Sequence, residues 1–158
     1  MPTPSSPTLT RRSQVSVIGS GAEHVAAAEE VGRLLAASGC VVVTGGEDEV
    51  MAAAHRGAKS AGGETIAILP GERHEAANRW ADHVVVTGIG HARNLAVAAS
   101  GQAVIAVGGS WGTLSEIAFA RRLGRHVVAL EGAPAVEGVP VASTAAEAVA
   151  LILQSLDL

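Results

Sequence analysis

Short apolar, β-branched runs alternate with longer alanine-rich stretches along almost the whole chain. In the first long stretch, Val25, Ala28 and Leu35 fall at helical spacing, with charged residues on the opposite face. The short runs are nearly continuously apolar, which is typical of parallel strands that are covered on both faces. This alternation predicts an α/β fold: a single domain with a doubly wound, Rossmann-like parallel sheet and helices on both faces.

The pattern also predicts where the elements lie. Residues 1–13 are rich in Pro, Ser and Thr and are expected to form a disordered tail, so that residues 14–158 make up the domain. We predict strands at Gln14–Ile18, Val41–Thr44, Glu64–Leu69, Asp82–Val86, Ala103–Val107 and His126–Leu130. We predict helices at Ala22–Ser38, Asp48–Ala61, Ile89–Ala99, Trp111–Leu123 and Ala145–Leu156.

Charge and cysteine content limit the classes of partner. A formal net charge of −4, without a cluster of Lys and Arg, argues against nucleic acid. The single cysteine, Cys40, excludes an intramolecular disulfide and fits a reducing compartment. No signal-peptide pattern is present, and the longest uncharged stretch, residues 94–115, is rich in glycine and polar residues. We therefore expect a cytoplasmic protein without nucleic-acid or membrane partners.

Five consecutive predicted strands end in glycine-containing turns. Because the carboxyl ends of parallel strands share one edge of the sheet, where ligands bind in such folds, the turns predict a rim that approaches a ligand closely. The turns are Gly19-Ser20-Gly21, Thr44-Gly45-Gly46, Pro70-Gly71-Glu72-Arg73, residues 87–94, and Gly108-Gly109-Ser110-Trp111-Gly112-Thr113.

The fifth turn is the strongest candidate for an anion site. Its glycines expose successive N–H groups, and the helix that follows adds the positive end of its dipole. Arg93, in the neighbouring turn, could hold a phosphate with two parallel hydrogen bonds. The spacing Thr113-x-x-Glu116 has a second interpretation as a capping box, in which both side chains only satisfy N–H groups at the helix end.

Other catalytic interpretations have less support. The first turn lacks the third glycine of the dinucleotide fingerprint, because His24 stands there, so NAD binding is not expected. The fifth turn spells a nucleophile elbow around Ser110, but no downstream acid and histidine are placed to complete a triad. Pyridoxal phosphate needs a lysine, and Lys59, the sole lysine, is predicted to be a solvated surface residue. The histidines show no ligand spacing, so no metal site is predicted.

Five segments occur in an order that is characteristic of one superfamily. They are residues 17–21 (VIGSG), 43–51 (VTGG followed by Met51), 68–71 (ILPG), 90–94 (GHARN) and 108–116 (GGSWGTLSE). Over residues 14–155 the chain therefore resembles the LOG-like, or SLOG, superfamily, whose members are often mislabelled lysine decarboxylases. Lys59, as a predicted surface residue, is not placed for a Schiff base, which speaks against that label here.

The resemblance implies two functions. The cytokinin-activating enzymes of the superfamily are phosphoribohydrolases that cleave nucleoside 5′-monophosphates, and their catalytic Arg and Glu correspond to Arg93 and Glu116. The short molybdenum-cofactor carrier-like proteins bind a pterin phosphate without known chemistry. Val107, Ala92 and Asn94 replace the Pro, Glu and Lys of the enzyme motifs, so the carrier-like branch is the better match.

The expected function is thus binding of a phosphate-bearing nucleotide-like or pterin ligand, with the molybdenum cofactor or a nucleotide as the bound molecule and no further cofactor required. A phosphoribohydrolase with Glu116 and Arg93 as catalytic residues, and a structural paralogue with an unused site, are the alternatives. The short, alanine-rich chain is expected to form a homodimer or homotetramer, as the resemblance implies. The predicted ligand-binding residues are Gly19, Ser20, Gly21, Gly45, Gly46, Arg93, Asn94, Gly108, Gly109, Ser110, Gly112 and Thr113.

Overall fold

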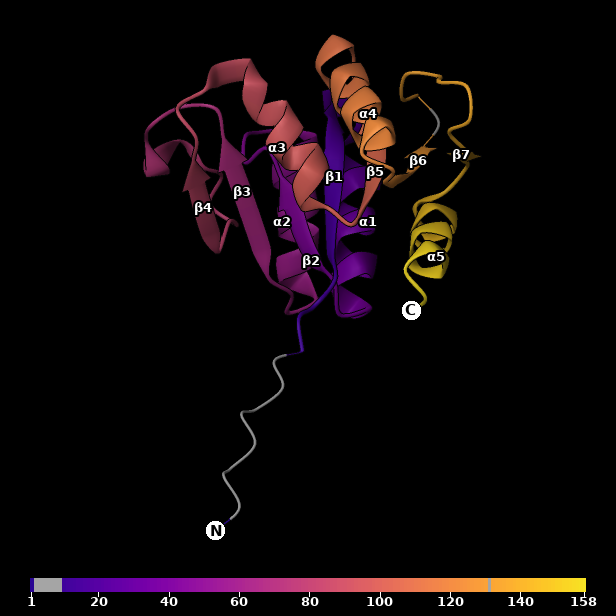
Figure 1. Ribbon diagram of the computed structural model, residues 1–158, viewed down its shortest axis with the longest axis horizontal. Helices are drawn as coiled ribbons and strands as arrows, with labels where there is room; N and C mark the ends of the chain where they lie inside the picture. The colour runs from indigo at the N-terminus through magenta and orange to yellow at the C-terminus, as the bar shows by residue number, and fades with distance from the viewer. Residues whose placement is uncertain (2–9, 131) are drawn as a thin grey trace.

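Seven parallel strands form one sheet within the residues that the computed structural model describes, which are Met1, residues 10–130 and residues 132–158. Their order across the sheet is β4-β3-β2-β1-β5-β6-β7 (Figure 1). The strands are β1 (Gln14–Ser20), β2 (Val41–Thr44), β3 (Thr65–Leu69), β4 (His83–Val86), β5 (Ala103–Gly108), β6 (His126–Leu130) and β7 (Val141–Ala142).

Helices cover both faces of the sheet. One apolar core lies between the sheet and α1, α2 and α5, and includes Leu35 and Ile105. The other lies beneath α3 and α4, which cross the front of the sheet in Figure 1, and includes Ile18 and Ile117. The helices are α1 (Val25–Ala37), α2 (Val50–Ser60), α3 (Arg93–Ser100), α4 (Trp111–Arg122) and α5 (Ala145–Ser155). The doubly wound, Rossmann-like parallel fold is therefore confirmed.

The direction of the strand order changes at β1. Strands β2 to β4 lie on one side of it, and β5 to β7 lie on the other. The chain leaves β1 toward α1 on one face and leaves β5 toward α4 on the opposite face. A crevice opens at such a switch point, outside the carboxyl ends of the two strands, where Ser20 pairs with Gly108.

Most predicted boundaries lie within two residues of the observed ones, and three differences are larger. A turn of 3-10 helix (Gly90–Ala92) replaces the start of the predicted helix Ile89–Ala99, so α3 begins at Arg93. Another such turn (Ala22–His24) precedes α1. The pattern missed β7, which is only two residues long. Residues 2–9 of the predicted tail lie outside the described residues. No helix in the described part of the chain has both the length and the apolar character to cross a membrane.

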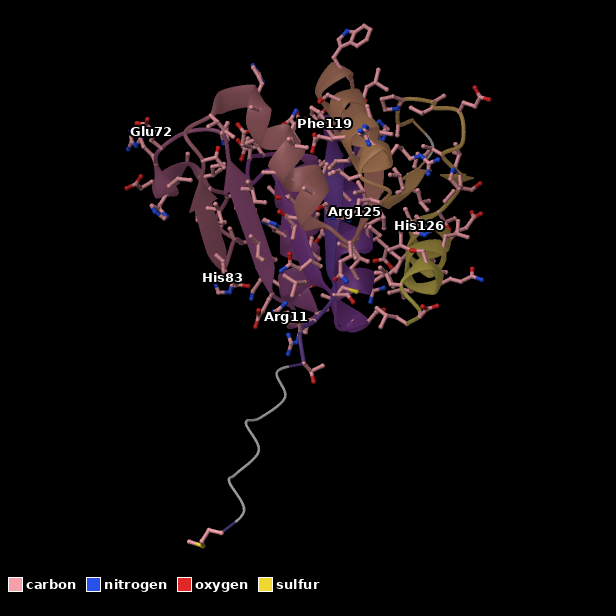
Figure 2. All side chains as sticks on the ribbon, in the orientation of Figure 1. Arg11, Glu72, His83, Phe119, Arg125 and His126 are labelled. Carbon is pink, nitrogen blue, oxygen red and sulfur yellow. The ribbon has the colours of Figure 1, made fainter. Side chains whose placement is uncertain are left out.

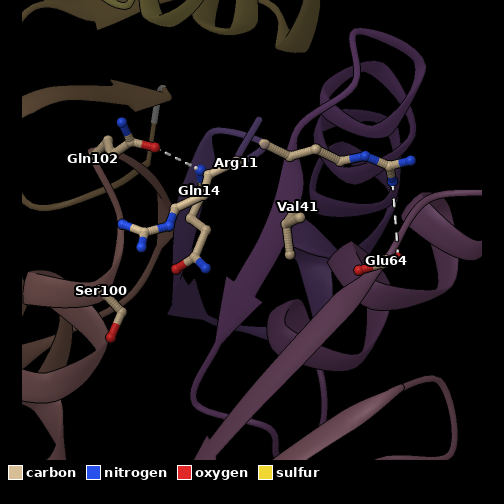
Figure 3. Close-up of a pocket in the computed structure, with 7 residues that line it drawn as sticks. Arg11, Gln14, Val41, Glu64, Ser100 and Gln102 are labelled. Atoms are coloured by element: carbon tan, nitrogen blue, oxygen red, sulfur yellow. Dashed lines mark hydrogen bonds and ion pairs between the residues drawn. The ribbon is translucent and has the colours of Figure 1, made fainter. Parts of the chain in front are cut away.

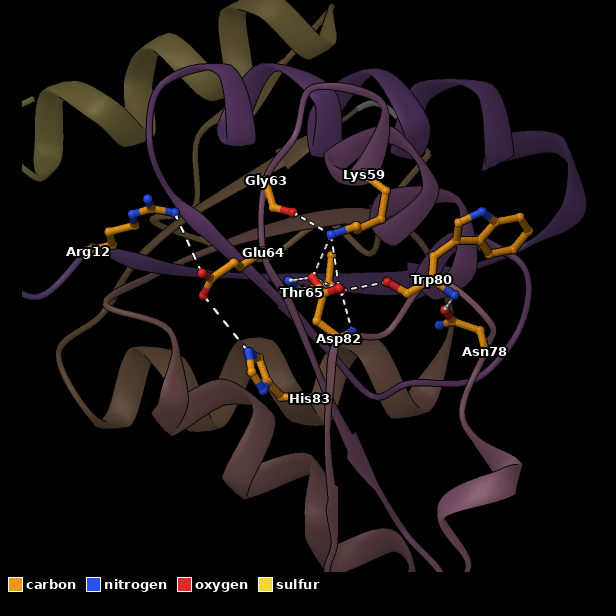
Figure 4. Close-up of polar contacts among 9 residues, drawn as sticks. All are labelled: Arg12, Lys59, Gly63, Glu64, Thr65, Asn78, Trp80, Asp82 and His83. Atoms are coloured by element: carbon orange, nitrogen blue, oxygen red, sulfur yellow. Dashed lines mark hydrogen bonds and ion pairs between the residues drawn. The ribbon is translucent and has the colours of Figure 1, made fainter.

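The sole lysine lies partly exposed at the surface and is held there in an ion pair. Lys59 Nζ donates to Gly63 O at 2.9 Å and to both carboxylate oxygens of Asp82, at 2.9 and 2.8 Å (Figure 4). Asp82 also accepts from the N–H of Thr65 at 3.0 Å, and Thr65 Oγ1 donates to Trp80 O at 2.6 Å. This cluster joins the end of α2 to the starts of β3 and β4, at the edge opposite the glycine turns. Its ion pair links residues 23 positions apart, which a local pattern cannot reveal.

Candidate functional site

A pocket of about 170 Å³ lies at the switch point, where the turns after β1, β2 and β5 meet the start of α3. Many of the predicted site residues line it, namely Gly19, Ser20, Gly45, Arg93, Asn94, Ser110, Gly112, Thr113 and Glu116. Met51 and His91 also line it and were not predicted, although both stand in the segments that carry the family resemblance. The pocket brings together residues from four turns that are far apart in the sequence.

Four predicted residues do not line this pocket, namely Gly21, Gly46, Gly108 and Gly109. They shape the turns instead. The N–H of Gly46 donates to Thr44 Oγ1 at 2.9 Å, and the N–H of Gly21 donates to Glu49 Oε2 at 2.8 Å. Gly109 has φ +110°, and a Cβ there would overlap Thr113. These glycines are explained by the fold alone.

The amino end of α4 faces the pocket without a side-chain cap. Ser110 is the N-cap residue, the helix begins at Trp111, and Thr113 already lies in its first turn. The capping-box interpretation of Thr113 and Glu116 is therefore wrong. Within the described ranges, the N–H groups of Trp111, Gly112 and Thr113 have no hydrogen-bond acceptor. Unpaired N–H groups at a helix start, together with the helix dipole, form an anion-binding site.

Arg93 is a buried cation at the floor of the pocket. Its side chain is only 9% exposed, and one terminal nitrogen, Nη2, donates to Glu47 Oε1. Nε has no hydrogen-bond partner among the residues that the structure describes. Gly45 makes room for the guanidinium, since a Cβ there would overlap Nη1. A buried donor without an acceptor is costly, and Arg93 brings a positive charge to the wall of the pocket.

Glu116 lines the same pocket from α4 and is 8% exposed. Burial raises the pKa of Glu116 to about 8, and the positive charge of Arg93 opposes this effect only in part. In the described part of the chain, Arg93 pairs with Glu47 and makes no ion pair with Glu116. Burial thus favours the protonated form of this carboxyl group in the pocket.

A buried histidine fixes the turn that follows β2. His55 is fully buried on α2; Asn78 Nδ2 donates to its Nδ1 (3.2 Å), which leaves Nε2–H to donate to Thr44 Oγ1 (3.1 Å). Asn78 also donates to Glu47 O at 3.2 Å. Burial lowers the pKa of His55 to about 4. This network holds the Gly45-Gly46-Glu47 segment against Arg93.

We expect His55 to make the fold acid-sensitive. The unfolded chain binds a proton at this site below about pH 6.5, but the folded chain does so only near pH 4, so stability falls as pH falls through this window. The loss should reach about 3 kcal/mol at pH 4. Urea unfolding from pH 7 to pH 4 measures it. His55→Gln should flatten this slope, whereas His126→Gln, at an exposed site, should not; equal slopes in all three proteins would contradict the assignment.

The turn before α2 contains a strained residue. Glu49, the N-cap of α2, has φ 57° and ψ −122°, a conformation that glycine adopts but other residues rarely do. Its carboxylate accepts from the N–H of Gly21 at 2.8 Å. This contact links the turns after β1 and β2 at the rim of the pocket.

Relief of this strain should be measurable. Glu49→Gly is expected to be more stable than Glu49→Ala by about 1 kcal/mol, because both variants lose the carboxylate but only glycine fits the backbone. Thermal or chemical unfolding of the two variants gives the difference directly. An alanine variant as stable as the glycine variant would show that the backbone at residue 49 is not strained.

A cavity of about 650 Å³ lies at the opposite edge of the sheet. Its walls include Arg11, Gln14, Glu64 and Gln102, as Figure 3 shows. Arg11 and His83 lie at this amino edge in Figure 2, whereas Glu72 lies at the carboxyl edge. Ligands in open α/β sheets bind beyond the carboxyl ends of the strands, so the smaller pocket at the switch point is the functional candidate.

Residues 12–155 match the model of the SLOG cluster4 family. The chain belongs to this family. An uncharacterized protein of Archaeoglobus fulgidus is 42% identical over 145 residues, which cover 90% of this chain and 95% of that protein. The resemblance to the LOG-like superfamily is therefore confirmed.

Two solved structures have the same fold as this SLOG cluster4 chain. The molybdenum cofactor binding protein of the phototrophic bacterium Rippkaea orientalis has a TM-score of 0.86 and 32% identity, covering 95% of this chain and 100% of that chain. The molybdenum cofactor carrier protein of Chlamydomonas reinhardtii has a TM-score of 0.85 and 33% identity, covering 94% and 100% respectively. The solved structures similar to this chain thus include a protein that binds the molybdenum cofactor and a protein that carries it.

Proposed function

We propose that this SLOG cluster4 protein binds the molybdenum cofactor, a pterin that carries a phosphate, as a transported ligand. Its phosphate would lie against the first turn of α4, with Arg93 beneath it. The function of the Rippkaea orientalis and Chlamydomonas reinhardtii proteins supports the ligand class. The chemistry of the pocket supports the position of the phosphate.

The main support for this proposal is the presence of glycine at position 112, in the first turn of α4. Its φ lies outside the left-handed region, and a Cβ there would meet only Asn94 Nδ2, at an ordinary 3.7 Å. Neither backbone conformation nor packing therefore requires glycine, although glycine in a helix costs up to about 1 kcal/mol relative to alanine. Because Gly112 lines the pocket at the uncapped end of α4, close approach of a ligand to the backbone accounts for it.

The charges in the pocket also suit a phosphate. Arg93 is buried and has an unpaired Nε, and three N–H groups of α4 are without acceptors among the described residues. Glu116 is neutral at pH 7, because burial raises its pKa to about 8, so it adds little repulsion. A phosphate would accept charge-assisted hydrogen bonds from the unpaired N–H groups of α4 and would lie beside the positive charge of Arg93.

The ligand can be identified by co-purification. The protein would be purified without oxygen from cells that make the molybdenum cofactor and from cells that cannot, and its ligand released, oxidised and identified by fluorescence and mass. We expect a phosphorylated pterin only from the first cells. Arg93→Met should lose it, whereas Arg122→Gln, at an exposed site on α4, should retain it. No pterin in the wild-type protein would contradict the proposed function.

A phosphoribohydrolase is a second candidate because Glu116 is a buried carboxyl group inside the pocket, and burial raises its pKa to about 8. Such a group could donate a proton to a departing base while Arg93 holds the 5′-phosphate. Incubation with a panel of nucleoside 5′-monophosphates, followed by chromatography for free base, tests this. Base release that Glu116→Gln abolishes without loss of binding would favour the enzyme over the carrier. No release from any of them would exclude it.

We also propose that the protein forms a homodimer or homotetramer through α4. Trp111, Phe119 and Leu123 are exposed at intervals that place them along one side of the helix, and Trp111 is 83% exposed. Burial of such a stripe would stabilise an oligomer. Light scattering should find more than one chain per particle, and Trp111→Glu should shift the particles toward monomers. A monomeric wild-type protein would contradict this.

A further inference from the structure

A second pocket, of about 260 Å³, continues from the pocket at the switch point toward the turns after β3 and β4. The two pockets share His91, Arg93 and Asn94, so they form two compartments of one site. The second compartment is bounded by Glu47, Pro70 and Gly90. A Cβ added to Gly90 would have no neighbour within 4 Å, so the space beside this residue is open. If the phosphate lies at α4, as the proposed function requires, the rest of the ligand extends into this compartment.

Glu47 gives the second compartment its hydrogen-bonding character. Its side chain is 47% exposed, and Oε1 accepts from Arg93. Oε2 has no partner among the residues that the structure describes. A carboxylate can only accept hydrogen bonds, with about four lone pairs on its two oxygens. Arg93 anchors this carboxylate on one side and leaves it free to accept from a ligand on the other.

The ligand group that matches a carboxylate is a pair of adjacent N–H donors in one plane. The 2-amino-4-oxo edge of pterin and of guanine has such a pair, from the ring N–H and the amino group. Adenine lacks this pair, and hypoxanthine lacks the amino group. The apolar ring of Pro70 offers a surface for the flat face of a heterocycle.

We infer that Glu47 is a specificity residue, which selects a phosphate-bearing ligand whose heterocycle has a 2-amino-4-oxo edge. This inference rests on the proposed function for the position of the phosphate. Hydrogen bonding to Glu47 would make the site prefer a pterin or a guanine nucleotide over other phosphorylated heterocycles. It also explains why an acidic residue lies beside a site for an anion.

Calorimetric titration with GMP, IMP and AMP tests the inference, because GMP and IMP differ only in the 2-amino group. We expect GMP to bind at least about tenfold more tightly than IMP, as one hydrogen bond to a charged group allows. In Glu47→Gln the ratio should fall to near one. Asp48→Asn, which removes an exposed acid from the same turn, should keep the wild-type ratio. Thermal unfolding would verify that both variants are folded.

Glu47→Gln also removes a counter-ion from Arg93. That effect acts on the phosphate, which GMP, IMP and AMP share, so it shifts all three affinities together. The ratio of the GMP and IMP affinities therefore still reports on the contact between Glu47 and the 2-amino group. A pterin with a phosphate ester on its C6 side chain distinguishes a pterin ligand from a guanine nucleotide. If this pterin binds more tightly than GMP, the site is a pterin site. If it binds more weakly than GMP, the site is a guanine-nucleotide site. Equal binding of GMP and IMP by the wild-type protein would overturn the inference and leave the proposed function standing. No binding of any phosphorylated probe would overturn both.

Discussion

Gly112→Ala is expected to abolish ligand binding while leaving the protein at least as stable as the wild type. The new Cβ would occupy space beside the uncapped N–H groups of α4, where the phosphate is proposed to lie. Loss of even two charge-assisted hydrogen bonds weakens binding by about 100-fold or more. Alanine is the better helix former, so the stability should rise by roughly 0.5 kcal/mol. Titration with the phosphorylated pterin and urea unfolding measure the two effects.

Gly109→Ala is the matched control on the same turn. Gly109 has φ +110° and is packed against Thr113, so alanine there should destabilise the fold itself. A binding defect with intact stability is therefore expected at residue 112 alone. If Gly112→Ala binds the ligand as well as the wild type does, the phosphate does not contact the start of α4.

Glu116→Gln is expected to stabilise the protein at high pH and to have little effect at low pH. In the unfolded chain Glu116 loses its proton near pH 4.5, whereas in the folded chain burial holds its pKa at about 8. The unfolded state therefore binds fewer protons between these values, and stability falls as pH rises through the window. At about 1.4 kcal/mol per pH unit, the penalty reaches about 4 kcal/mol at pH 8. Glutamine is neutral and avoids it.

Urea unfolding of the wild type and Glu116→Gln from pH 4 to pH 9 measures this gain. The difference between the two proteins should be small at pH 4 and grow steadily above pH 5. Glu137→Gln, at an exposed site in the loop after β6, should show no such growth. A constant difference across the range would mean that Glu116 ionises normally in the folded protein. The expected penalty is typical of a group that is retained for function at a cost in stability.

Much of this architecture could be predicted from local patterns. Continuous apolar strands such as Val41–Thr44 indicate a sheet that is covered on both faces. The helical spacing of apolar residues between the strands indicates the helical layers on the two faces. The positions of the turns followed, because parallel strands place their carboxyl ends at one edge. The resemblance to the SLOG superfamily then singled out Arg93 and Glu116, which both line the pocket.

The interactions within the site could not be predicted, because they depend on three-dimensional distance. The pairing of Arg93 with Glu47 spans 46 residues, and the sequence offered no reason to choose Glu47 over its acidic neighbours. Thr113 and Glu116 have the spacing of a capping box, but α4 starts two residues before Thr113 and makes that role impossible. The raised pKa of Glu116 likewise arises from burial, which a motif does not reveal.

The central claim is that the ligand is held by its phosphate, at the start of α4 and Arg93. The most direct test compares the dissociation constants of one pterin with and without its phosphate ester, measured on the wild-type protein by titration. Hydrogen bonds to charged groups contribute about 1.5–3 kcal/mol each, so the phosphate ester should bind at least about 100-fold more tightly. Equal affinities would contradict the claim and place the recognition elsewhere on the molecule.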